Sequence, residues 1–312
     1  MLVTGGAGFI GSHVVDRLVD EGYSVCVVDN LHTGNLANIS KHVNRGLVDF
    51  VEADVFDRDA VSKVVSGVEA VVHLAAIVSV PFSLENPRLT REVNVDGTRG
   101  LLELCVKSGV SKFIFASSSS VYGAPRYLPI DEAHPTCPIS PYAESKLEAE
   151  GCCSEFENVW ELDAFILRLF NVYGSRQASG DYSGVITKFV ENAKKNVPLV
   201  IYGDGGQTRD FVHVTDVADL VLKVVEYECV GGTFNIGCGR AVSINDLAKM
   251  VLGLSGRDCG IVYEAPRKGD ILHSYADTSK AQRAFGFDPQ MSLKEGLWEL
   301  LASWRSSSRW KI

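Results

Sequence analysis

Two kinds of hydrophobic spacing alternate along the first half of the chain. Short apolar runs predict buried strands at residues 1–4, 25–29, 47–54, 70–74, 113–117 and 164–169. Between them, apolar residues three and four apart predict helices at residues 12–21, 94–108 and 141–157. Strands that alternate with helices of this length form right-handed βαβ units. The pattern therefore predicts an α/β fold with a doubly wound parallel sheet, covered by helices on both faces.

The second half of the chain has a less regular pattern. It predicts a polar, glycine-bearing loop at residues 174–184, a strand at 233–237, and helices at 187–195, 216–228, 243–254 and 293–304. Because no Pro/Ser-rich linker separates the halves, we expect a smaller α/β domain that lies directly against the first. The expected first domain comprises residues 1–171 plus about 208–238, and the second about 172–207 plus 239–312.

Composition and charge narrow the class of protein. The chain has 312 residues, 46% of them apolar and 22% charged, which is typical of a folded globular protein. With 30 Lys+Arg and 39 Asp+Glu, the net charge of −9 makes nucleic-acid binding unfavourable. The eight cysteines have neither metal-site nor disulfide-framework spacing. No apolar run is long enough to span a bilayer. We expect a cytoplasmic protein with no metal and no membrane partner.

A glycine motif lies between the first strand and the first helix. Gly5, Gly8 and Gly11 form G-x-x-G-x-x-G, where missing side chains allow positive φ and close approach of a pyrophosphate to the helix N-terminus. Asp29 ends the second strand, 18 residues after Gly11. This is close to the roughly 20 residues expected for a ribose-binding carboxylate. Since that carboxylate repels a 2′-phosphate, the motif predicts a Rossmann domain that binds NAD. Asp54 and Val55, after the third strand, are candidates for the adenine edge.

A second motif carries candidate catalytic groups. Tyr142 and Lys146 are spaced i and i+4 on a predicted helix, so the phenol and the ammonium share one face. A nearby cation favours phenolate and is expected to lower the pKa of the tyrosine. The serine run 117–120 follows a strand, at the sheet edge where open α/β folds bind ligands. A serine hydroxyl there is suited to holding a sugar oxygen while Tyr142 removes its proton.

These motifs resemble the extended short-chain dehydrogenase/reductase family. Further segments in the same order strengthen the resemblance, namely residues 73–76, 94–98, 121–123 and 167–171. Segments 202–205, 207–214 and 267–270 are similar to the nucleotide-sugar branch, most closely to UDP-glucose 4-epimerases. The resemblance covers nearly the whole chain.

The resemblance implies a role for each matching residue. Tyr142 would be the catalytic base, Lys146 its electrostatic partner, and Ser118 the contact to the sugar hydroxyl, with Ser117 as the fallback. The implied NAD contacts are Gly5, Gly8, Phe9, Ile10, Gly11, Asp29, Asn30, Thr33, Gly34, Asp54, Val55, Leu74, Ala75, Ala76, Asn94, Ser117, Tyr142, Lys146 and Phe170. The implied UDP-sugar contacts are Ser118, Asn171, Val185, Val200, Tyr202, Arg209, Arg267, Asp270 and Ser274. His73 and His213 are interpreted as structural.

The family contains several reactions that begin by oxidising the sugar at C4. Its 4,6-dehydratases place Asp-Glu directly after the catalytic Ser/Thr, where this chain has Ser119 and Ser120. Its decarboxylases usually carry Glu at the position of Ser120. These differences favour NAD-dependent 4-epimerisation of UDP-glucose and UDP-galactose through a 4-keto intermediate, an isomerase activity. UDP-glucuronate epimerisation, other dehydratase or decarboxylase chemistry, and a non-catalytic NAD-sensing regulator are the alternatives.

Two finer expectations follow from the resemblance. A small residue at Ser274 leaves room for an N-acetyl group at the sugar C2, which predicts that UDP-N-acetylglucosamine and its galacto epimer are accepted. Family members commonly form dimers through two helices per subunit, which correspond to residues 94–108 and 141–157. One departure is Val78, which stands where several bacterial members carry a lysine that contacts the cofactor.

Overall fold

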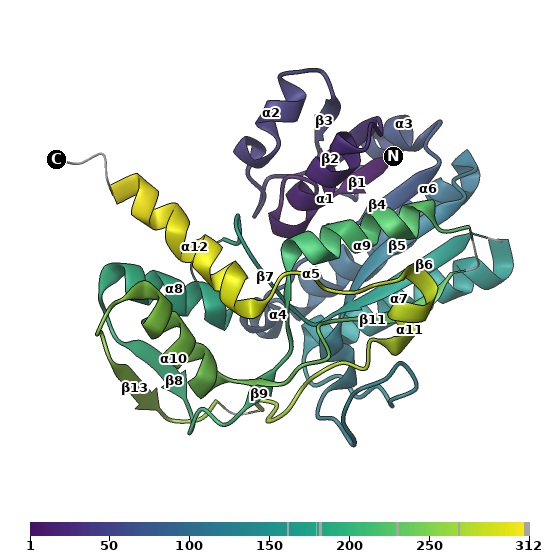
Figure 1. Ribbon diagram of the computed structural model, residues 1–312. Coiled ribbons are helices and arrows are strands. Elements are labelled where there is room, and N and C mark those ends of the chain that lie inside the picture. Colours follow the sequence, from purple (N-terminus) through teal and green to yellow (C-terminus); the bar gives the residue numbers. More distant parts are fainter. Residues whose placement is uncertain (161, 179, 181–182, 229–230, 268, 309–312) are drawn as a thin grey trace.

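A seven-stranded sheet forms the centre of the larger part of the molecule (Figure 1). The computed structural model describes residues 1–160, 162–178, 180, 183–228, 231–267 and 269–308, with side chains up to residue 302. Within them, the sheet order is β11-β6-β5-β4-β1-β2-β3, and every neighbouring pair is parallel. The strands are β1 (Leu2–Thr4), β2 (Val25–Asp29), β3 (Val48–Glu52), β4 (Ala70–His73), β5 (Lys112–Ser118), β6 (Asp163–Leu169) and β11 (Gly232–Ile236).

Helices cover both faces of this sheet, as the sequence predicts. One face carries α1 (Phe9–Asp20), α9 (Val214–Glu226) and α11 (Ser279–Phe285), and the other carries α3 (Arg58–Val65), α6 (Gly97–Ser108) and α7 (Pro141–Trp160). Each face has its own apolar core, because strands buried on both sides direct alternate side chains to opposite faces. The strand order reverses between β1 and β4, which is where open α/β sheets bind ligands.

A smaller group of elements lies beside the sheet, at the lower left of Figure 1. Helices α8 (Val185–Lys195), α10 (Ile244–Ser255) and α12 (Leu293–Ser308) share an apolar core with β8 (Leu199–Tyr202), which pairs in parallel with β13 (Ile261–Glu264). Two short ladders connect this group to the rest. They are β7 (Asn171–Tyr173) with β10 (Phe211–His213), and β9 (Thr208–Arg209) with β12 (Val242–Ser243).

Several short elements have no clear counterpart in the sequence pattern. The pattern does not predict the short helices α2 (Ser40–Val43), α4 (Val80–Glu85) and α5 (Pro87–Arg91), the two-turn helices α3 and α11, or the strands β7, β8, β9, β10, β12 and β13. Segments this short contain too few residues to display a period. The predicted helix 94–108 also begins differently, since Glu92–Asp96 forms a π-turn before α6 starts. None of the helices in the described ranges combines the length and apolar character that a bilayer-spanning segment requires.

Candidate active site

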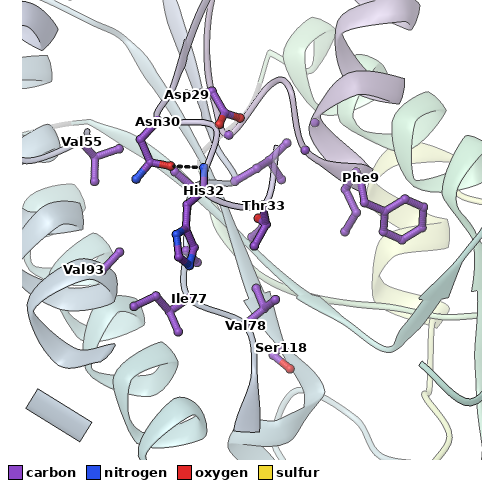
Figure 2. A pocket seen from close by; sticks show the side chains of 18 of the residues that line it. Phe9, Asp29, Asn30, His32, Thr33, Val55, Ile77, Val78, Val93 and Ser118 are labelled. Atoms are coloured by element: carbon purple, nitrogen blue, oxygen red, sulfur yellow. Dashed lines mark hydrogen bonds between the residues drawn. The ribbon is translucent and has the colours of Figure 1, made fainter. Parts of the chain in front are cut away.

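A cavity of about 520 Å³ opens at the carboxyl ends of the central strands (Figure 2). Its walls come from the loops after β1, β2, β3 and β4, from the ends of β5 and β6, and from α7. All predicted NAD contacts except Gly34 and Asn94 line it. The sheet therefore brings together residues that are spread from position 5 to position 170 of the chain.

The glycine loop forms the floor of the cavity at the start of α1. Gly5 has a φ of +70°, and a Cβ on Gly11 would lie 2.1 Å from the Gly5 carbonyl oxygen. Both positions therefore require glycine. Gly8 is the N-cap of α1 and offers no side-chain cap, so the first amides of the helix keep their capacity to bind an anion.

Asp29 stands at the end of β2 and is buried. Its carboxylate accepts hydrogen bonds from the amides of Ala7, at 3.0 Å, and Leu31, at 2.8 Å. These bonds fix the carboxylate beside the glycine loop and leave lone pairs for further donors. Next to it, the Asn30 amide donates to Asp54 at 2.9 Å, which joins the ends of β2 and β3 at the predicted adenine end of the cavity.

Tyr142, Lys146 and Ser118 meet at the other end of the cavity. Ser118 is hydrogen-bonded to Tyr142, and Lys146 donates from Nζ to the Ala116 carbonyl at 2.8 Å. Burial lowers the pKa of Lys146 to about 8. Burial raises the pKa of Tyr142, and the hydrogen bond from Ser118 acts in the opposite direction. The spacing of Tyr142 and Lys146 predicts a lowered tyrosine pKa, but desolvation of the phenol is the larger effect here.

Two predicted contacts, Asn94 and Gly34, lie outside the cavity lining, and a third, Ser117, lines it with its hydroxyl already bonded. Asn94 is buried behind the wall, where its side chain bonds both backbone groups of Ile77 and the Ser145 hydroxyl. Because these bonds use both amide hydrogens, Asn94 has none left to donate to a ligand and instead holds the Ile77 backbone in place. Gly34 lies directly against the Asp29 carboxylate and does not line the cavity. Ser117 does line it, but its hydroxyl donates to the carboxylate of Glu150.

The predicted UDP-sugar contacts lie mostly outside this cavity, with Ser118 as the exception. The structure groups four of them in two pairs near the smaller group of elements. Arg209 donates to Asp270 at 2.5 Å, and the Arg267 guanidinium lies 3.9 Å from the centre of the Tyr202 ring. Val200 precedes this tyrosine on β8, Val185 begins α8, and Asn171 begins β7. Ser274 lies four residues after Asp270 and is half-buried.

Comparison with known proteins identifies the family. Residues 1–237 match the NAD dependent epimerase/dehydratase family. The chain belongs to this family. UDP-glucose 4-epimerase from Thermotoga maritima, solved with UDP-glucose, is 38% identical, with a TM-score of 0.93 and 98% and 99% of the two chains covered.

Two further solved structures show how wide this family is. UDP-N-acetylglucosamine 4-epimerase from Methanobrevibacter ruminantium, solved with UDP-N-acetylmuramic acid, is 36% identical, with a TM-score of 0.93 and 98% of each chain covered. A dTDP-glucose 4,6-dehydratase from Streptomyces venezuelae, solved with NAD, is 33% identical, with a TM-score of 0.91 and 99% and 98% of the chains covered. The chain is an NAD-dependent isomerase of the UDP-sugar 4-epimerase family.

The residues of the cavity fit the cofactor of this family. NAD requires a glycine loop that its pyrophosphate can approach, and Cβ atoms on Gly5 and Gly11 would collide with backbone here. It also requires a carboxylate at the end of β2, the place of Asp29. Gly8, Phe9 and Ile10 would surround the pyrophosphate, and Asp54 and Val55 would lie beside the adenine. Lys146 is the only lysine or arginine in the described lining of the cavity. It lies at the opposite end of the cavity from Asp29 and Asp54, so neither carboxylate has a lysine or arginine of the cavity wall beside it.

Sequence reasoning missed part of the wall. These lining residues, mostly apolar and including one imidazole and one amide, are Val28, His32, Ala53, Ile77, Val78, Phe82, Leu89, Val93, Ala116, Leu169, Val172 and Gln177. Figure 2 shows His32 projecting into the cavity, with its backbone amide bonded to the Asn30 side chain. Val78 faces the cavity where several family members carry lysine. Apart from Val78 and Leu169, these positions belong to no motif named from the sequence. They come from strands, short helices and loops of distant parts of the chain, which only the fold brings together.

The two histidines of the family motifs have structural positions. His73 is buried between the Thr4 and Thr98 hydroxyls, at 2.6 and 2.9 Å, and burial lowers its pKa to about 3. His213 caps α9 and bonds the Thr215 hydroxyl at 2.7 Å, while burial lowers its pKa to about 4. Both imidazoles are therefore neutral near pH 7, and neither lines the cavity.

Proposed function

We propose that this chain interconverts UDP-glucose and UDP-galactose through a 4-keto sugar. The observation that carries the proposal is the contact of Ser118 with Tyr142, beside Lys146, at the end of a cavity that fits NAD. Family membership supports a UDP-sugar substrate. The absence of a carboxylate at Ser119 and Ser120 supports epimerisation over elimination or decarboxylation, since those reactions need a further acid or base.

In the proposed mechanism, Tyr142 takes the proton of the sugar 4-hydroxyl and later returns it. The Ser118 hydroxyl holds the same sugar oxygen and orients it toward the phenol. The Lys146 ammonium favours the phenolate, which burial alone disfavours. NAD, when bound, supplies the hydride chemistry at C4. The reaction needs no further acid or base, because the keto sugar only has to present its other face.

The UDP part would be held by the second group of predicted residues. Arg209 and Arg267 would bind the diphosphate, since guanidinium groups bind phosphate oxygens in pairs. Val200 and Tyr202 would lie beside the uracil, and Asn171, Val185 and Asp270 would complete the site. The pairing of Arg209 with Asp270 keeps one guanidinium oriented and supports this assignment. Remote binding of UDP would leave the sugar free to rotate.

The first experiment tests turnover and the base together. Purified protein is incubated without added NAD with UDP-galactose, UDP-N-acetylgalactosamine or UDP-glucuronate, and the products are resolved by chromatography. We expect conversion of UDP-galactose to UDP-glucose. Tyr142→Phe should lower kcat by at least about 100-fold, because general base catalysis is lost, while UDP affinity is unchanged. Full activity in that variant contradicts the proposed role of Tyr142. Conversion of UDP-glucuronate alone contradicts the proposal that UDP-glucose and UDP-galactose are the substrates.

We further propose that the N-acetylated UDP-sugars are substrates. Ser274 is small, and a relative that is 36% identical over nearly its whole length is a UDP-N-acetylglucosamine 4-epimerase. Ser274→Tyr should reduce kcat/KM for UDP-N-acetylgalactosamine by about 10-fold or more, since the added ring fills space for the acetyl group. Activity on UDP-galactose serves as the control and should persist. No conversion of the acetylated sugar by the wild type refutes the proposal.

We also propose a cytoplasmic homodimer in which α6 and α7 of each subunit meet. Support comes from the resemblance to dimeric family members, and from the seven described cysteines, which are all free thiols, as is typical of a reducing compartment. Light scattering coupled to gel filtration should give twice the chain mass of 33.9 kDa. A monomer mass refutes the dimer.

A further inference from the structure

The end of β5 is joined to α7 at three successive residues. The Ala116 carbonyl accepts from Lys146, the Ser117 hydroxyl donates to Glu150, and Ser118 bonds Tyr142. The three α7 partners are four residues apart, so they lie on one helix face, one turn after another. The proposed mechanism uses Tyr142 and Lys146 and leaves Glu150 without a role.

Glu150 is buried and forms a two-pronged ion pair with Arg168 of β6. The guanidinium donates from Nη2 to Oε2 at 2.6 Å and from Nε to Oε1 at 3.0 Å, and both side chains are less than a tenth exposed. Arg168 stands directly opposite Ser117 in the β5–β6 register. One carboxylate thus ties the catalytic helix to two neighbouring strands, just where both strands reach the cavity.

The same network continues toward the predicted substrate segment. Arg168 donates from Nη1 to the Tyr122 hydroxyl at 2.9 Å, and that hydroxyl donates to Asn235 at 2.7 Å. The Asn235 amide donates to the Ile130 carbonyl at 2.9 Å, and the Ile130 amide donates to the Tyr275 carbonyl. Tyr275 follows Ser274, so an unbroken path of hydrogen bonds joins α7 to the stretch proposed to face the sugar.

Glu150 lies one helical turn after Lys146 on the same face of α7, whereas Glu144 and Glu148 are nearer in the sequence but lie on other faces of the helix. Burial lowers the pKa of Lys146 to about 8, while Cys153 and Glu150 on the same helix act in the opposite direction. His73 of β4 faces the ammonium and is neutral, because burial lowers its pKa to about 3. Arg168 of β6 pairs with Glu150, and Tyr142 lies one turn before Lys146 on the same helix face.

We propose that Glu150 is a positioning residue of the epimerase site, one that sets the register of α7 on β5 and keeps an anion beside the Lys146 ammonium. The inference rests on the proposed function for its kinetic part only. A buried ion pair by itself is weak grounds for stability, because desolvation offsets the attraction of the charges. The direct hydrogen bond from Ser117, the neighbour of Ser118, is what connects this pair to the reacting groups.

The test compares three variants. Glu150→Gln removes the anion and keeps the shape of the side chain. The double variant Glu150→Gln with Arg168→Met removes both charges, so it leaves no buried guanidinium unpaired. It therefore provides a second test if the single variant fails to fold. Tyr122→Phe is the matched control, since it breaks the network beyond Arg168 and changes no charge beside Lys146.

The decisive readout is the titration of Lys146 itself. Its Nζ resonance in lysine-labelled protein, assigned with Lys146→Met, is followed by NMR as the pH rises. We expect the Glu150→Gln midpoint to be lower by about one pH unit, the double variant to lie between it and wild type, and Tyr122→Phe to match wild type. A Glu150→Gln midpoint equal to that of wild type, or an equal shift in Tyr122→Phe, overturns the proposal.

Kinetics with UDP-galactose provide the second readout. In Glu150→Gln, kcat at pH 8 should fall about 5-fold and the alkaline limb of its pH profile should move to lower pH, with KM within about two-fold of wild type. A fall in kcat with an unmoved alkaline limb indicates a merely structural role and overturns the proposal. If wild-type protein does not convert UDP-galactose, the proposed function fails, and the Lys146 titration still decides the role of Glu150.

Discussion

At the scale of single residues, burial decides the protonation of the groups in and around the site. Lys146 and Tyr142 share a helix face, as the sequence predicts, yet desolvation moves both pKa values toward the neutral form. His73 and His213 are likewise held neutral. The sequence names these groups but cannot give their pKa values, because solvent access depends on which elements cover them.

His213 makes stability depend on pH. Its folded pKa of about 4 lies below the ordinary histidine value of 6.5, so between these values the unfolded chain binds a proton that the folded chain does not. Stability should therefore fall as the pH drops from 6.5 to 4. His213→Asn keeps an N-cap acceptor for α9. In this variant the acid-induced loss of unfolding free energy should be smaller than in wild type by roughly 2–3 kcal/mol.

Urea unfolding at pH 7 and pH 4.5 measures this effect, as the difference between His213→Asn and wild type. The matched control is His32→Asn, which makes the same substitution at an exposed histidine. An identical loss of stability in wild type and His213→Asn contradicts the assignment of His213 as a buried neutral cap.

At the scale of elements, the turn from β1 into α1 is the most tightly constrained. Gly5 lies against the Ala75 backbone and Gly11 against the Gly5 carbonyl, so the helix can start only if neither residue has a side chain. This explains why the glycine spacing predicts the element and its ligand together. The sequences of short strands such as β9 and β12 carry no comparable signal. The pairing of these two strands nevertheless fixes the position of Arg209.

Gly11→Ala should prevent NAD binding. The new methyl would lie 2.1 Å from the Gly5 carbonyl, which must move and so displaces the loop. We expect at least about 100-fold weaker NAD affinity and a loss of roughly 2 kcal/mol or more in unfolding free energy. Calorimetric titration with NAD and urea unfolding provide the measurements.

Gly253→Ala is the control for a helical glycine. No atom lies within 4 Å of a Cβ at this position in α10, so the substitution should raise stability by about 0.5–1 kcal/mol and leave NAD affinity unchanged. If Gly11→Ala binds NAD as well as wild type, the glycine loop is not the cofactor site.

At the scale of the whole molecule, Asp210 connects segments from distant parts of the sequence. Its carboxylate, fully buried, accepts from the amides of Cys238 at 2.7 Å, Gly239 at 2.9 Å and Ala276 at 3.0 Å. Cys238 and Gly239 follow β11, and Ala276 comes two residues after Ser274. Asp210 therefore joins these two segments to each other, one residue away from Arg209.

Asp210→Asn should weaken both stability and UDP binding. An amide nitrogen in place of one oxygen leaves a buried amide donor unpaired, which costs about 1–3 kcal/mol of unfolding free energy. We also expect several-fold weaker UDP affinity, because Arg209 loses its fixed neighbour. Urea unfolding and calorimetric titration with UDP test this, with exposed Asp204→Asn as the control. Unchanged UDP affinity contradicts a positioning effect on Arg209.

The sequence alone determined those features whose parts lie close together along the chain. The glycine loop with Asp29, the Tyr142–Lys146 pair and the alternation of strands with helices depend on local geometry, and therefore on spacing. Only the tertiary structure placed Asn94 behind the wall and His32 and Gln177 in it, and only it joined Arg209 to Asp270 and Glu150 to Arg168. Such contacts depend on the register between separate elements and on how deeply each side chain is buried. A list of residue spacings does not contain that information.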